Sequence, residues 1–283
     1  MTARPVLTAR RGRLGAELRK LREQVGMTAT EAAKRLGTSS GQLSNVESAR
    51  FGVSAERVRA MARVYTCSDD AYVNALAAMA IERSSGWWEQ YRGILPAGLL
   101  DLAEFEHHAV ALRTAYTCHI PGLLQTPDHA RAVFGQVVPQ LAPPEIEHRV
   151  SHRIKRQDVI YRASPVTYSA VIHEAALRMK FGGRDAARKQ LEHILSMSSQ
   201  PHITVVVIPF DAGAYPGSGQ SMAYGLGPAS QLDTVHLDQS HGPVLLDAEH
   251  QLLKYRTLLD RMEAVALTPK KSQNFIRRIA QEL

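Results

Sequence analysis

The strongest constraint on the fold of this chain is a pair of helix-start patterns that flank a single glycine near the N-terminus. Thr28 and Glu31 form a T-x-x-E capping box, and Ser39 and Gln42 repeat the pattern as S-x-x-Q. Gly37 lies between them and permits the positive φ that a sharp turn requires. The sequence therefore predicts two short helices joined by a tight turn.

Apolar residues on both sides of this segment follow helical spacing. One face of a preceding helix carries Leu14, Leu18, Leu21 and Val25. Gly26 follows them and ends that helix, as a glycine at C′ does. Ser54 can cap a later helix with Val58 and Met61 on its apolar face. We expect a compact bundle of short helices.

The charge of the chain is concentrated in this N-terminal region. Residues 1–65 hold 13 Lys and Arg against 5 Asp and Glu, a net charge of +8. Residues 66–283 hold 21 against 22, a net charge of −1. A basic module on a neutral body is typical of nucleic-acid binding. The Arg-rich start, residues 1–15, has no apolar signal core and is predicted to be a flexible basic arm.

Other compositional features indicate a protein without a metal or a cofactor. The two cysteines, Cys67 and Cys118, have no metal-type spacing, which favours reduced thiols in the cytoplasm. His148 and His152 lie at i and i+4, but no third ligand accompanies them. No apolar run approaches the roughly 20 residues that a membrane span needs. We expect a cytoplasmic protein with no membrane, metal or cofactor association.

The helix after Gly37 has the composition of a DNA-reading helix. Leu43 and Val46 face its core side, so short or polar side chains remain on or near the outer face. Asn and Gln suit adenine edges in the major groove, while flanking arginines suit phosphates or a minor groove. The predicted DNA-binding residues are Ser39, Ser40, Gly41, Gln42, Ser44, Asn45, Arg50 and Arg11.

The same segment resembles the helix-turn-helix domains of the Cro and phage-repressor (XRE) class. The matching positions are Met27, Thr28, Glu31, Ala33, Leu36, Gly37, Ser39, Ser44 and Glu47. The resemblance implies a structural pair between Arg22 and Glu47, and homodimeric binding to a double-stranded DNA operator. Two positions depart from the family pattern, since Ala29 replaces a phosphate-contacting Gln and Ala49 replaces the Gly after the recognition helix.

The rest of the chain resembles the C-terminal domain of actinobacterial developmental, antitoxin-like regulators, of the DUF5753 type. The segments that carry this resemblance are IPGLLQTPDHARAVF, VSHRIKRQDVIYR, VIHEAALRMKFGG, ITVVVIPFDAGAYPG and the ending LLKYRTLLDRMEAVALTPKKSQNFIRRIAQEL. The resemblance implies a small partner protein encoded nearby, and a diffusible effector is the alternative. The possible partner or effector surface comprises Trp87, Trp88, Tyr91, Asp211 and Tyr215.

Periodicity predicts an α+β organisation for this C-terminal part. Helical patterns cover residues 102–116, 127–137, 144–161 and 174–198, and a last helix starts at Thr268 and Pro269. Strand patterns cover 166–172, 203–208, 222–225, 234–237 and 243–246. The predicted fold class is an all-α N-terminal helix-turn-helix bundle joined to a larger α+β C-terminal domain. The predicted domains are 1–66 for DNA binding, 67–84 as a connecting helix with a breaker at residues 84–86, and 85–283 for effector or partner binding and dimerisation.

No catalytic arrangement stands out in the sequence. Gly217-Ser218-Gly219 lacks the G-x-S-x-G spacing of a nucleophile elbow, and residues 213–227 lack a phosphate-loop pattern. A Ser, His and Asp triad can only be assembled on paper, from Ser218, Ser221, Asp238, Ser240, His241 and Asp247. We therefore predict a non-enzymatic, sequence-specific transcriptional regulator, with repression favoured. The alternatives are an antitoxin-like protein that mainly neutralises a partner, and an enzyme with a DNA-binding appendage.

Overall fold

The computed structural model describes residues 8–81, 86–239 and 242–283. The chain divides into two compact units, which are Met1–Glu89 with Pro228–Leu232, and Gln90–Gly227 with Asp233–Leu283. The first unit is helical, and the second combines helices with a six-stranded sheet. The structure therefore confirms the predicted fold class.

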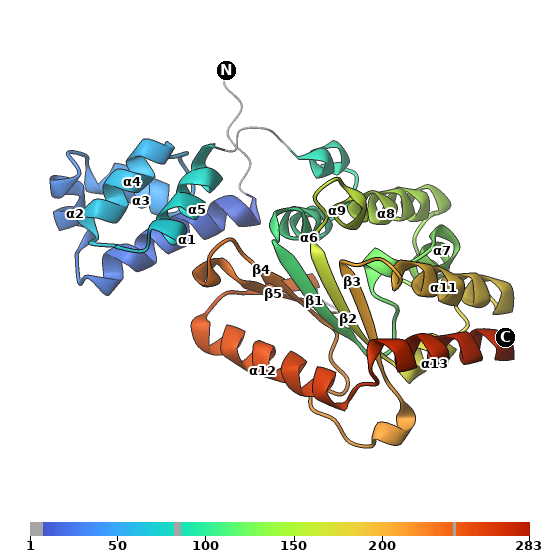
Figure 1. The fold of residues 1–283 in the computed structure, drawn as a ribbon. Helices are drawn as coiled ribbons and strands as arrows, with labels where there is room; N and C mark the ends of the chain where they lie inside the picture. Colours follow the sequence, from blue (N-terminus) through green and yellow to red (C-terminus); the bar gives the residue numbers. More distant parts are fainter. Residues whose placement is uncertain (1–7, 82–85, 240–241) are drawn as a thin grey trace. The chain divides into compact units, whose positions relative to one another are not determined.

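The first unit is a bundle of five helices. They are α1 (Ala9–Gln24), α2 (Ala29–Arg35), α3 (Ser40–Glu47), α4 (Ala55–Val64) and α5 (Asp70–Ile81) (Figure 1). The side chains of Thr8, Thr28, Ser39 and Ser54 cap the first four by accepting a bond from a backbone amide in the first turn. The helices bury a shared apolar core that includes Leu18, Leu36, Leu43, Val58 and Met61.

Two expectations for this unit are wrong in part. Residues 67–84 were expected to form a connecting helix between the domains, but α5, which lies within this range, places Tyr72, Leu76 and Ala77 in the bundle core. The expected flexible arm ends earlier than predicted, because α1 begins at Ala9 and its Arg-rich first turns are helical. Arginine is a good helix former, so these turns need no apolar face. The rest of the predicted arm, residues 1–7, and the breaker serines lie outside the described residues.

The second unit is built on one mixed sheet in the order β3-β2-β1-β4-β5-β6. Its strands are β1 (Ala111–Tyr116), β2 (Thr167–His173), β3 (Ile203–Ile208), β4 (Met222–Leu226), β5 (Thr234–Gln239) and β6 (Gly242–Leu246). The pairs β1–β2 and β2–β3 are parallel, whereas β1–β4, β4–β5 and β5–β6 are antiparallel. The sheet therefore changes from parallel to antiparallel at β1.

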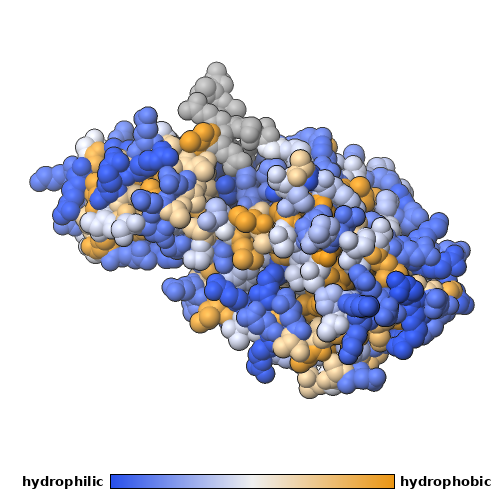
Figure 2. All heavy atoms as spheres, viewed as in Figure 1, coloured by the Kyte–Doolittle hydropathy of each residue, from blue (hydrophilic) through white to orange (hydrophobic). Residues whose placement is uncertain are grey.

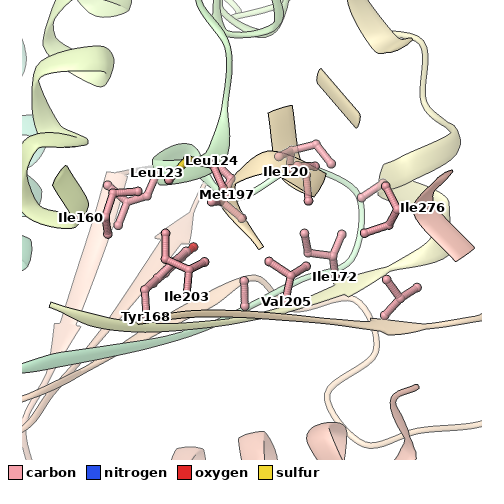
Figure 3. Close-up of a cluster of buried hydrophobic side chains, with 14 of the residues drawn as sticks. Ile120, Leu123, Leu124, Ile160, Tyr168, Ile172, Met197, Ile203, Val205 and Ile276 are labelled. Carbon is pink, nitrogen blue, oxygen red and sulfur yellow. The ribbon is translucent and has the colours of Figure 1, made fainter. Parts of the chain in front are cut away.

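Helices cover both faces of this sheet (Figure 1). They are α6 (Ala97–His108), α7 (Pro127–Phe134), α8 (Pro143–Arg156), α9 (Asp158–Tyr161), α10 (Glu174–Arg178), α11 (Arg184–Met197), α12 (Glu249–Val265) and α13 (Pro269–Glu282). Tyr168, Ile172 and Val205 point from one face toward Met197 of α11 and Ile276 of α13 (Figure 3). The opposite face packs against Leu252, Tyr255, Leu259 and Met262 of α12.

The structure corrects two secondary-structure predictions in this unit. Residues 102–116 were predicted to be helical, but α6 ends at His108 and residues 111–116 form β1. The alternation of buried Leu112 and Thr114 with half-buried neighbours is a strand pattern that short apolar runs share with helices. Residues 174–198 form two helices, because Gly182 and Gly183 adopt φ of 76° and 91° between them.

Candidate nucleic-acid interface

The turn between α2 and α3 has the local geometry that the sequence predicts. Thr28 Oγ1 accepts a bond from Glu31 N (3.2 Å), and Glu31 Oε2 accepts one from Thr28 N (3.0 Å). These hydrogen bonds lower the pKa of the Glu31 carboxyl group. Gly37 adopts a φ of 62° and reverses the chain before Ser39 caps α3. Both helix starts are thus fixed locally, independently of the rest of the bundle.

A buried ion pair joins the C-terminal end of α3 to α1. Arg22 Nε donates to Glu47 Oε1 (2.7 Å) and Arg22 Nη2 donates to Glu47 Oε2 (2.9 Å). Arg22 Nη1 also donates to Met27 O (2.7 Å), so one guanidinium joins α1, the start of the turn and α3. The bond to Glu47 raises the pKa of Arg22 despite burial. This is the pair that the family resemblance implies.

Gly15 permits a close approach of α1 and α3 that the sequence analysis did not single out. A Cβ at Gly15 would lie 2.5 Å from Glu47 O and 2.9 Å from Val46 O, which is closer than side-chain carbons come to backbone atoms. Gly12, one turn earlier, has open space around the same position. The end of α3 therefore packs directly against the backbone of α1 at Gly15, with no side chain between them.

The predicted DNA-binding residues lie at and near the start of α3, except for Arg50 and Arg11. Five of them are exposed in or beside the first turns of that helix: Ser39, Ser40, Gly41, Gln42 and Ser44. Asn45 is half-buried, and the described residues give its side chain no hydrogen-bond partner. Arg50 is exposed beyond the helix, and Arg11 is exposed in the first turn of α1.

The side-chain oxygen of Gln42 is already engaged in hydrogen bonds within the turn. Its Oε1 accepts bonds from Thr38 Oγ1 (2.6 Å) and from Ser39 N (3.4 Å). Only its amide nitrogen remains for a further contact in this geometry. Asn45 has both amide groups available, so it is the stronger candidate for a bidentate contact with adenine.

Two features just after α3 were not predicted. Ala49, which replaces the usual glycine, adopts a φ of 55° in the left-handed region. Phe51 is 56% exposed, which is unusual for so large an apolar side chain, and its amide donates to Asn45 O (3.1 Å). The exposure of Phe51 could not be predicted from the spacing of apolar residues, because Phe51 lies in a loop, where no helical or strand periodicity applies.

Exposed basic side chains surround the turn and the helices that follow it. Five of them form no ion pair with any residue in the part of the chain that the structure describes: Lys34, Arg35, Arg50, Arg59 and Arg63. Hydrophilic residues also predominate over the helical unit on the face that Figure 2 shows. Such unneutralised cations suit the phosphates of a duplex.

The predicted aromatic surface is not exposed as a whole. Trp88 and Tyr91 are 4% and 8% exposed, so the expectation that they form a surface is wrong. The Tyr91 hydroxyl lies 3.0 Å from Ser151 Oγ, and its ring packs edge-on against His152. Trp87 is half-buried.

The second part of that predicted surface remains accessible. Asp211 is exposed, and Tyr215 is half-buried with its ring stacked on His173 at 5.3 Å. Phe210, 54% exposed, packs edge-on against the same histidine ring. A surface role for Asp211 and Tyr215 stays a prediction.

The other candidate sites gain little from the structure. Among the described residues no group of three or more His, Cys, Asp or Glu is placed to hold a metal ion. Two residues of the hypothetical triad, Ser240 and His241, lie outside the described residues. None of the helices in the described ranges is both long and apolar enough to cross a membrane.

A capped helix–turn–helix with an exposed polar second helix and unpaired surface cations defines a DNA-binding regulator. A family model described as a helix-turn-helix domain matches residues 13–76, in agreement with this class. The model of a domain of unknown function, DUF5753, matches residues 99–278. The chain therefore belongs to the DUF5753 family, as the sequence resemblance predicts. The comparisons find no match among curated proteins and none among solved structures.

Proposed function

We propose that this protein is a sequence-specific transcriptional repressor that binds operator DNA as a homodimer through α3. The observation that carries the proposal is the exposed start of α3, held in place by the Arg22–Glu47 pair at its other end. A helix presented in this way enters a major groove about 12 Å wide with its first residues toward the base edges.

Specificity and affinity are assigned to different residues in this proposal. Asn45, Ser40 and Ser44 contact base edges, because they are short or polar and lie on α3. Arg50 and Arg11 contact phosphates or a minor groove, which adds affinity for any sequence. The positive end of the α3 dipole adds to this attraction near the phosphates.

The second unit serves in this proposal as a non-catalytic domain that binds an effector or a small partner protein and contributes to dimerisation. A regulator responds to a signal only if the signal binds its DNA-bound and free states with different affinity. Buried polar groups without partners in this unit, such as both ring nitrogens of His129, favour a binding role. The partner-protein alternative is tested by titrating the product of the neighbouring gene into the protein–operator complex and measuring the operator affinity.

The experiment for DNA binding starts from selection of duplexes out of a random pool by the full chain. The enriched duplex should contain two half-sites about 34 Å apart, as expected for a dimer. Its affinity should fall steeply with salt, because phosphate contacts release counterions. Arg50→Ala should weaken binding to enriched and random duplexes alike. An absence of enrichment, or an affinity independent of salt, would refute the proposal.

A further inference from the structure

A small pocket lies in the second unit beside the end of β1, where the sheet changes from parallel to antiparallel. Its walls come from α6, α8, β1, β2, β4 and the turn after β1, and they include Glu106, Thr114, Tyr116, Gly122 and Arg156. The free volume is about 10 Å3, which accommodates roughly one water molecule. Ligand sites of open sheets with parallel strands favour the carboxyl ends of those strands.

Arg156 of α8 lines this pocket, and Arg153, one turn earlier in α8, lies beside it, with its Nε 3.8 Å from the position of a Cβ at Gly122. Among the described residues, only Arg156 is paired with a carboxylate. Arg156 Nε and Nη2 donate to the two Glu106 oxygens at 2.7 and 2.5 Å, and both side chains are 6% exposed. Arg153 has no ion pair among the described residues; its Nη1 donates to Gln125 Oε1 (2.6 Å). A cation in such surroundings is normally paired with an anion.

The surroundings of Arg153 hold no carboxylate that is paired with it among the described residues. Its guanidinium lies over the Phe134 ring, 4.1 Å from the centroid, and its buried Nε has no hydrogen-bond partner. Burial and the neighbouring Arg156 lower the pKa of Arg153 to about 10, so it stays charged near neutral pH. The acidic groups that act on it are Glu106, which Arg156 already engages, and the exposed Asp238.

Gly122 keeps the space in front of these arginines open. A Cβ at this position would lie 3.4 Å from Arg156 Nη2 and 3.8 Å from Arg153 Nε. The backbone of Gly122 does not have a positive φ, so the turn itself does not require glycine. An alanine therefore fits without strain, but its methyl group occupies the space that both guanidinium groups face.

The Tyr116 hydroxyl provides a further donor at the same place. It has no hydrogen-bond partner among the described residues, and burial raises the pKa of Tyr116 to about 12, so the phenol keeps its proton. The charges of Arg156, Glu106, Asp238 and Arg153 act on this hydroxyl, in decreasing order of effect. Tyr116, Gly122 and Arg153 are each partly exposed, so a ligand can approach from solvent on this side.

We propose that this pocket binds the carboxylate group of a small organic acid, held by Arg153, the Tyr116 hydroxyl and the free edge of Arg156. One carboxylate oxygen occupies the pocket, which has room for about one water molecule. The other oxygen faces Arg153 beside Gly122, where the pocket is reached from solvent. A single unpaired cation matches the single charge of a carboxylate better than the double charge of a phosphate. The inference rests on the proposed effector-binding role of the second unit, for which it names a ligand class.

The experiment measures binding of acetate to the full chain by ligand-observed NMR at constant ionic strength. Acetamide, which has the same shape without the charge, is the ligand control, and inorganic phosphate tests the charge preference. N-acetylglycine represents a peptide C-terminus, so its affinity relative to acetate distinguishes a protein-borne carboxylate from a free acid. We expect saturable binding of acetate and none of acetamide.

Two variants assign the binding to the pocket. Tyr116→Phe should weaken acetate binding by about tenfold or more, because one charge-assisted hydrogen bond is lost. Gly122→Ala should weaken it by a similar factor, because the methyl group occupies the space of the carboxylate. Gly135→Ala is the matched control, because its Cβ meets only backbone oxygens, at 3.4 and 3.5 Å, at the end of α7. It should leave the affinity unchanged.

Unchanged acetate affinity in both pocket variants would overturn the inference, as would equal binding of acetamide or the absence of any acid binding. The operator affinity of each variant is measured in parallel. A chain that binds operator DNA but no acid refutes only the carboxylate site, whereas a chain that binds acid but no DNA refutes the proposed repressor function.

Discussion

The two units of the chain each bury an arginine–glutamate pair, but they surround it differently. In the helical unit, Arg22 also donates to Met27 O, and the pair joins α1 to the end of α3. In the α+β unit, the Arg156–Glu106 pair has a second cation beside it, Arg153, which forms an ion pair with none of the residues that the structure describes. The first arrangement holds two helices together, whereas the second surrounds the carboxylate site that we propose.

Histidine sharpens this contrast. All 12 histidines lie beyond residue 106, and none lies in the helical unit. Burial, together with the smaller effect of nearby arginines, lowers the pKa of His129 and His236 to about 4 and that of His152 to about 3. These three side chains are 5% exposed or less.

Acidification should therefore destabilise the α+β unit selectively, which is the largest effect we expect. Between about pH 6.5 and pH 4 the unfolded chain protonates these histidines while the folded unit keeps them neutral, so stability falls as the pH falls. The three groups together remove about 5 kcal/mol between pH 7 and pH 5. Hydrogen exchange, corrected for intrinsic rates, should show protection lost in the α+β unit only. Equal loss in both units would contradict the contrast.

The same substitution in the two ion pairs should have unequal costs. Glu106→Gln leaves the buried Arg156 without a carboxylate and next to a second cation, the partly exposed Arg153, and should reduce the free energy of unfolding by about 4 kcal/mol. Glu47→Gln should cost less, about 2 to 3 kcal/mol, because Arg22 keeps Met27 O and lies 3.6 Å from the Glu23 carboxylate. Thermal and denaturant unfolding of both variants measures the difference. A larger cost for Glu47→Gln would break the comparison.

Gly15→Ala tests the seating of α3 on α1. The added methyl group meets Glu47 O, so we expect a loss of about 1 to 3 kcal/mol and weaker operator binding. Gly12→Ala in the same helix is the control and should be neutral or stabilising by up to about 1 kcal/mol, because it has open space. Similar melting temperatures for the two variants would show that α1 and α3 do not approach this closely.

The smallest expected effect is a gain at Ala49. Glycine removes the strain of the left-handed φ of 55°, so Ala49→Gly should stabilise the helical unit by about 0.5 to 1 kcal/mol. Ala16→Gly, at an exposed position inside α1, should have the opposite sign and cost about 1 kcal/mol. Equal signs for the two substitutions would rule out strain at Ala49.

Local patterns account for most of what the sequence predicted correctly. Capping boxes, the glycine of the turn and helical spacing act within a few residues, so α2, α3 and their caps were predictable. The strand β1 was missed because its few residues fit a helical pattern as well, and only pairing with β2 and β4 decides between them.

Residues whose roles depend on distant neighbours were not predictable in this way. Gly15 matters because α3 crosses it, and Gly122 matters because α8 places two arginines against it. Arg153 and Tyr116 come from separate elements, and no spacing in the chain relates them. Conversely, Trp88 and Tyr91 were predicted to form a surface because of their residue type, but both side chains are buried.

Reading of DNA by α3 is tested most directly by comparing Asn45→Ala with the unmodified chain on enriched and random duplexes. The ratio of the two affinities should fall by the equivalent of about 1 to 3 kcal/mol, because a bidentate base contact is lost. Ser48→Ala, which removes a hydroxyl that donates to the backbone oxygens of Ser44 (2.7 Å) and Asn45 (3.4 Å) but leaves the Asn45 side chain in place, should leave the ratio unchanged. An unchanged ratio for Asn45→Ala, with the fold intact, would contradict the assignment of α3 as the reading helix in this register.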